Sequence, residues 1–145
     1  LPAERAAAGR QIDGALEYVP KAAASLFVGD TVTHEHDLRL PLGRPGDRAA
    51  AAIELSTDGY VRWLGRRLKE HDLPSLLVRA GGREWIAGKT EPEITAEAPS
   101  VFDLLRALTG RRTRDEIAAF EWSADAEPYL DVFSMYGMPR APLGE

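Results

Sequence analysis

The segment Gly29–Gly43, GDTVTHEHDLRLPLG, contains acidic and histidine side chains at regular intervals. Asp30, His34 and Asp37 are separated by four and three residues, so on an α-helix they share one face. His36 points nearly the opposite way on such a helix. Imidazole and carboxylate groups bind zinc, iron or nickel, and a further carboxylate can orient the ligating histidine. The spacing indicates half of a metal site, with a solvated polar helix end as the alternative.

The composition restricts the class of protein. The chain has 145 residues, 44% of them apolar and 28% charged, which is typical of a globular protein with a real core. A net charge of −5 gives no general preference for nucleic acid or an anionic membrane. Because the sequence has no cysteine, metal ligands must be nitrogen or oxygen atoms, and thiol chemistry needs an external thiol. The longest apolar run, Ala22–Val28, is too short for a membrane span, and no secretory-signal pattern opens the sequence, so we expect a cytoplasmic protein.

The elements that position these residues are predicted to be helical in the first half of the sequence. We expect helices over Ala3–Tyr18, Lys21–Arg39 and Ala49–Glu70. Asp47 is a candidate N-cap for the third helix, and Gly59 and Gly65 interrupt its pattern. Pro74 prevents much continuation beyond it.

From Leu73 onward the pattern favours short strands and short helices. Strands are expected over Ser75–Ala80, Arg83–Ala87 and Pro92–Ala98, and helices over Val101–Leu108, Asp115–Phe120 and Pro128–Phe133. Gly81 and Gly82 form a favoured hairpin turn. Ser100 and a capping box from Thr113 to Glu116 begin the first two of these helices. The sequence therefore predicts an α+β fold, with helices in residues 1–72 and an α+β unit in residues 73–145.

Two groups of basic residues are further candidates for binding. Arg111 and Arg112 follow Gly110 in a turn between predicted helices, a position suited either to holding an anion or to simple exposure. The second group could bind phosphates, but Glu70 follows it directly and a solvated helix face is the favoured interpretation; its members are Arg62, Arg66, Arg67 and Lys69.

The order of two longer motifs resembles a known family. VGDTVTHEHDLRLPLGRPGDR is similar to the last metal-binding helix of the DinB/YfiT-like superfamily, and within it to the mycothiol-dependent maleylpyruvate isomerase family. GGREWIAGKTEPEITAEAPSVFDLLRALTGRR resembles the C-terminal domain of that family, which has a sterol-carrier-protein-like α+β fold. The resemblance implies a partial DinB-like bundle in residues 1–72 and a sterol-carrier-like domain in residues 73–145. The N-terminal part of the family pattern, including a helix with a histidine ligand, has no counterpart in this sequence.

The same resemblance assigns roles to individual residues. It implies that Asp30 and His34 bind a divalent metal, zinc or nickel, with Asp30 at a position where the family usually has glutamate. It implies that Asp37 orients His34 from the second shell of the metal. Arg111 aligns with the catalytic arginine near the interdomain active site, and Arg112, an equal match to that turn, is assigned to cofactor binding.

The implied activity is isomerisation of an unsaturated acid, or transfer of a thiol to a small electrophile. The cofactors would be the metal and mycothiol or another small thiol, with another chain or segment supplying the missing helices and histidine. Two other classes of function stay open. A lipid- or small-ligand-binding module would use a tunnel lined by residues that suit a core equally well, namely Leu76, Val78, Ile86, Ile94 and Phe102. An accessory subunit would expose an apolar face on Lys21–Arg39 and Ala49–Glu70.

Overall fold

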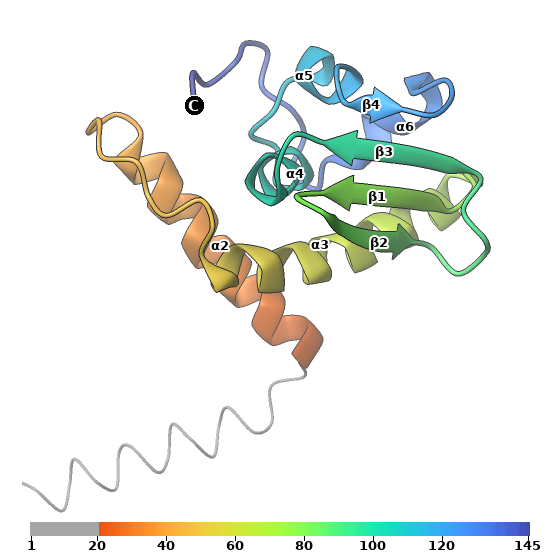
Figure 1. The fold of residues 1–145 in the computed structure, drawn as a ribbon, viewed down its shortest axis with the longest axis horizontal. Helices are drawn as coiled ribbons and strands as arrows, with labels where there is room; N and C mark the ends of the chain where they lie inside the picture. Colours follow the sequence, from red (N-terminus) through yellow and green to blue (C-terminus); the bar gives the residue numbers. More distant parts are fainter. Residues whose placement is uncertain (1–20) are drawn as a thin grey trace, which may run out of the picture.

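The computed structural model describes residues 21–145, with side chains from Ser25 onward, and these residues form an α+β fold (Figure 1). The elements in chain order are α2 (Lys21–Arg39), α3 (Ala51–Glu70), β1 (Leu76–Ala80), β2 (Arg83–Ala87), β3 (Ile94–Ala98), α4 (Val101–Leu108), α5 (Arg114–Ala118), β4 (Glu121–Trp122) and α6 (Glu127–Phe133). The α+β prediction is confirmed. The helix predicted over Ala3–Tyr18 lies outside the described residues.

The strands form one mixed sheet in the order β2-β1-β3-β4. β1 and β2 make an antiparallel hairpin, β1 and β3 are parallel, and the short β4 pairs antiparallel with β3. Gly81 and Gly82 connect β1 to β2 with φ values of +56° and +76°, which an L side chain rarely adopts. Both positive values match the turn type expected for a two-residue hairpin, so that prediction is confirmed. The sequence analysis did not predict β4.

The core lies between one face of the sheet and the helices. Leu76, Val78 and Ala80 alternate with half-buried residues along β1, as a strand with one buried face requires. α3 packs on β2, α4 and α6, and its Leu64 and Leu68 belong to the same apolar cluster as the strand residues. Residues from the predicted helical part and the predicted α+β part therefore share one core.

The apolar residues considered for a tunnel fall into different environments. Leu76, Val78 and Phe102 are buried in the core. Ile94 packs against it while partly buried, and Ile86 is 54% exposed. None of the helices in residues 21–145 is both long and apolar enough to cross a membrane.

The glycines of α3 permit close packing instead of interrupting the helix. A Cβ atom at Gly59 would lie 2.5 Å from the Ser25 hydroxyl oxygen on α2. A Cβ at Gly65 would lie 2.4 Å from the backbone nitrogen of Gly88, just after β2. Their small size lets α2 and β2 approach α3, so the predicted interruptions are wrong.

Two of the three predicted helix starts are confirmed. The Ser100 side chain accepts a hydrogen bond from the backbone of Asp103, and Thr113 and Glu116 form the reciprocal capping box. Asp47 is not the N-cap of α3, because that position is Ala50. Asp47 instead accepts a hydrogen bond from the Ala49 backbone at 2.9 Å and stabilises the preceding turn.

We expect Gly65→Ala to destabilise the fold, although alanine favours an isolated helix over glycine by about 1 kcal/mol. The added methyl group would meet the Gly88 backbone, so α3 and β2 must separate. Overpacking costs about 1–3 kcal/mol, and the urea midpoint of unfolding should fall. Arg66→Ala, at an exposed position of the same helix, is the control. A midpoint equal to or above that of the unsubstituted chain would contradict this close contact.

Candidate functional site

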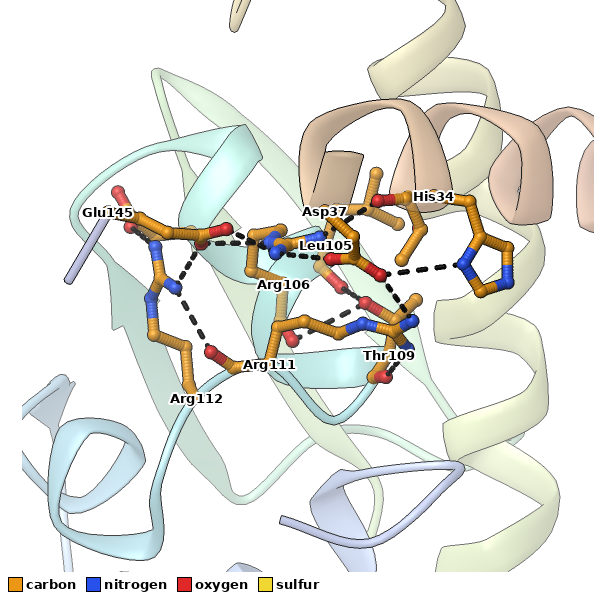
Figure 2. A network of polar contacts seen from close by, with 10 residues as sticks. His34, Asp37, Leu105, Arg106, Thr109, Arg111, Arg112 and Glu145 are labelled. Atoms are coloured by element: carbon orange, nitrogen blue, oxygen red, sulfur yellow. Dashed lines mark hydrogen bonds and ion pairs between the residues drawn. The ribbon is translucent and has the colours of Figure 1, made fainter. Parts of the chain in front are cut away.

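One face of α2 holds the three residues that the sequence predicted to act together. The His34 Nε2 atom is 3.4 Å from Asp30 Oδ1, and the Nδ1 atom is 3.5 Å from Asp37 Oδ2. The imidazole therefore has a carboxylate beside each ring nitrogen, and Figure 2 shows the one at Asp37. The side chains of His34 and Asp30 are 60% and 64% exposed. His36 is buried against Phe102 with ring centroids 4.7 Å apart, which confirms that it points away from this face.

The Asp30–His34 pair fits two ligands of one metal ion. Tetrahedral zinc with bonds of about 2.0–2.2 Å places two ligand atoms about 3.3–3.6 Å apart. The 3.4 Å between His34 Nε2 and Asp30 Oδ1 lies in this range. Asp37, at the other ring nitrogen, occupies the position of a carboxylate that orients a metal-bound histidine. Within residues 21–145, no group of three or more histidine, aspartate or glutamate side chains is arranged to hold a metal ion.

Asp37 also connects α2 to the end of α4. Its Oδ1 atom accepts a hydrogen bond from Arg106, and its Oδ2 atom accepts one from Arg111, both at 2.7 Å (Figure 2). Arg111 also donates to the carbonyl oxygen of Thr109. The structure therefore brings the predicted residue Arg111 to Asp37 and His34.

The two predicted arginines lie in different places. Arg112 turns away from His34 and donates a hydrogen bond to Glu145 (Figure 2). It also donates one to Asp103 at 2.8 Å. Its side chain is only 8% exposed. The structure therefore separates Arg112 from the α2 face that carries the other predicted site residues.

Arg106 connects Asp37 on α2 with Glu145, and the sequence analysis did not identify it as a site residue. Its side chain is fully buried and donates to the Thr33 carbonyl oxygen at 3.2 Å, to Asp37 and to both carboxylate oxygens of Glu145. The available signal was the apolar sequence of α4, VFDLLRAL, in which a charged residue has to be buried with a partner.

The surrounding charges control the protonation of Asp37. Burial opposes ionisation, but hydrogen bonds from Arg111 and Arg106 and their positive charges outweigh it. The pKa of the Asp37 carboxyl is therefore below its ordinary value, and the group is negative at neutral pH. His36 behaves differently, because burial and the charge of Arg106 lower the pKa of its imidazole and favour the neutral form.

Two tyrosines lie near the exposed end of the site. Burial, a hydrogen bond with Tyr136 and the negative charge of Asp30 all raise the pKa of Tyr60, so its hydroxyl stays protonated. A Cβ at Gly29 would lie 2.6 Å from Cε2 of Tyr60, so the glycine before Asp30 makes room for this ring. The sequence analysis assigned neither tyrosine to the site. Their position beside Asp30 depends on packing between segments.

The site combines an exposed imidazole–carboxylate pair with an arginine, and the Tyr60 side chain beside it is buried. Such groups can hold a cation and a neighbouring organic anion. Comparison of the chain with protein-family models, curated proteins and solved structures finds no match. The function of the site therefore has to be inferred from its own residues.

The ion pair between Asp103 and Arg112 predicts a pH-dependent stability. Burial opposes ionisation of Asp103, but hydrogen bonds from Ser100 and Arg112 hold the pKa of its carboxyl below the ordinary value. A folded-state pKa below the unfolded one, about 3.9, stabilises the fold above that pH, and the contribution is lost as pH falls through the folded pKa.

We therefore expect Asp103→Asn to lower the free energy of unfolding at pH 7 by about 1–2 kcal/mol, with the difference closing below about pH 4. Urea unfolding between pH 2 and pH 7 measures this. Asp115→Asn, an exposed carboxyl on α5, is the control. A difference that stays constant over the whole pH range would contradict the assigned ion pair.

Proposed function

We propose that this chain contributes half of a divalent-metal site to an enzyme that uses a small thiol. The metal would be zinc or nickel, bound by His34 and Asp30, and the thiol mycothiol or a similar molecule. The supporting observation is the 3.4 Å between His34 Nε2 and Asp30 Oδ1, with a carboxylate at the other ring nitrogen. When bound, the metal would lower the pKa of the thiol and so supply a thiolate nucleophile at neutral pH.

The residues around the pair would keep it in a binding geometry. With a metal bound between Nε2 and Asp30, Asp37 would face the N–H at Nδ1 and orient the ring. Arg106 and Arg111 hold Asp37 itself in place and keep it charged. His34 is therefore oriented before any metal binds.

Arg111 is suited to binding a carboxylate of the substrate or thiol. Its hydrogen bonds to Asp37 and to the Thr109 carbonyl use two of the five donors of a guanidinium. The remaining donors would position an unsaturated acid or a small electrophile. Addition and loss of the thiolate would isomerise the acid, and addition alone would transfer the thiol to the electrophile.

An exposed apolar face supports completion of the site by another segment. Phe27 and Leu38 are 68% and 70% exposed, and they lie seven and four residues from His34 on the same face of α2. Leu55 on α3 is 48% exposed. We infer that α2 and α3 belong to a DinB-like bundle, attached to a sterol-carrier-like unit formed by the sheet and α4–α6. A second chain or segment that packs on this face would bring the remaining ligand.

We expect zinc or nickel binding to depend on His34 and Asp30. In equilibrium dialysis with elemental analysis, His34→Ala and Asp30→Ala should each weaken binding at least about tenfold, because each loses one of two ligands. His71→Ala, which removes an exposed histidine elsewhere, should leave binding unchanged. Equal binding by all four proteins would exclude His34 and Asp30 as ligands. Undetectable metal binding by the unsubstituted chain would overturn the proposal that the chain contributes half of a metal site. It would favour a metal-independent role.

A second prediction concerns the orienting carboxylate. Asp37→Asn should lower metal affinity by about 10–100-fold, because the partner that fixes the His34 ring is weakened while both ligands remain. Asp103→Asn is the matched control, since it breaks an ion pair of the same polar network without touching His34. The metal affinity of each folded variant is measured by competition with a chelating indicator. Equal losses in both variants would indicate a general structural effect instead of orientation of His34.

A further inference from the structure

A groove separate from the His34 cluster runs beside the basic face of α3. It has a volume of about 940 Å³ and lies between α3, the α2 residue Leu26, β2 and the loop that follows β2. Among the described residues, those that line it include none of the residues assigned to the metal site. This volume is within the range of about 300–1,000 Å³ that is usual for small-molecule sites.

The rim of the groove carries an excess of positive charge. Its basic residues are Arg62, Arg66, Lys69 and Lys89, and Asp72 is the only carboxylate among the described lining residues. No ion pair joins these four cations to a carboxylate within residues 21–145. This local excess contrasts with the net charge of −5 for the chain.

Arg67 differs from the other basic residues of α3, namely Arg62, Arg66 and Lys69. Arg67 approaches Glu70 at 3.6 Å and lies 5.7 Å from the centroid of the Trp63 ring. Its charge is therefore engaged in contacts within α3, and it is absent from the residues that line the groove. The other three basic residues of the run are directed to the groove, which the sequence alone treated as an ordinary solvated face.

The floor of the groove is apolar. Leu26, Leu68, Leu73 and Ile86 line it, and Ile86 is 54% exposed on β2. Gly65 and Gly88, which approach each other closely, also line the groove and add no side chain to it. Arg62 donates a hydrogen bond to the Ser25 hydroxyl at 3.3 Å, but the four cations form no ion pair within residues 21–145. An exposed isoleucine beside such cations favours a ligand with both an apolar part and a negative charge.

We propose that this groove binds an organic anion with an apolar chain. The carboxylate or phosphate of the ligand contacts Arg62, Arg66, Lys69 and Lys89, and the chain lies along the apolar floor. Arginine presents paired donors to such oxyanions, and the neighbouring lysines add positive charge. Binding at this site requires no metal and is independent of the function proposed for His34.

A fluorescent long-chain fatty acid, used as a monomer, tests the proposal against the neutral alcohol with the same chain and fluorophore. We expect saturable binding of the acid, and binding of the alcohol weaker by about tenfold or more, because a charged hydrogen-bonded contact is lost. Arg66→Glu should weaken binding of the acid by a similar factor. Arg140→Glu, which makes the same charge change at an exposed position outside the groove, should leave it unchanged. Addition of a chelator, or His34→Ala, should also have no effect.

The apolar floor is tested by Ile86→Glu, with Leu42→Glu as its control, since Leu42 is 69% exposed and lies outside the groove. Only Ile86→Glu should weaken binding of the acid.

Several outcomes would overturn the proposal: equal binding of acid and alcohol, equal loss in Arg66→Glu and Arg140→Glu, or no saturable binding. Competition by inorganic phosphate as strong as by unlabelled fatty acid would indicate a simple anion site. Binding only to vesicles containing anionic lipid would indicate a membrane surface instead.

Discussion

The position of α2 depends on the burial of one positive charge on α4. The Arg106 side chain has no exposed surface, so its charge requires partners inside the protein. Asp37 and the Thr33 carbonyl provide them from α2, and Glu145 provides a carboxylate from the other end of the described chain. Removing one partner of a buried ion pair costs about 3–5 kcal/mol. Arg106 therefore links segments that are 69 and 39 residues away from it along the sequence.

This constraint also determines the chemistry available to His34. Asp37 shares its negative charge with Arg106 and Arg111, so it attracts a proton less strongly than an unpaired carboxylate would. Its Oδ2 atom lies 3.5 Å from Nδ1 of His34, so the carboxylate that pairs with both arginines also lies beside the imidazole. The same carboxylate thus contributes to stability and to the geometry of the candidate site.

The two proposed sites differ in how they could be recognised. The His34 site has a sequence signal, because the spacing of Asp30, His34 and Asp37 predicts one helical face. The structure places these three side chains together on that face. The groove has only a partial signal, because Arg62, Arg66 and Lys69 look like a solvated face until β2 and its loop are placed beside them. Lys89 joins them through folding alone. Both sites use the surfaces of α2 and α3, and the glycines of α3 allow the close packing that forms them.

The sequence by itself determined the elements whose signals are local. The predicted bounds of α2, β2 and α4 match the structure, as do the Gly81–Gly82 hairpin turn and the two side-chain caps. These features depend on residues within one or two turns of each other. Tertiary contacts alone place Arg111 against Asp37 and Arg112 against Glu145, and they explain why Gly65 permits close packing instead of interrupting α3. The effect of an arginine charge, or of a missing glycine side chain, depends on the partners that folding brings close to it. Asp37 and Arg111, for example, are 74 residues apart in the sequence.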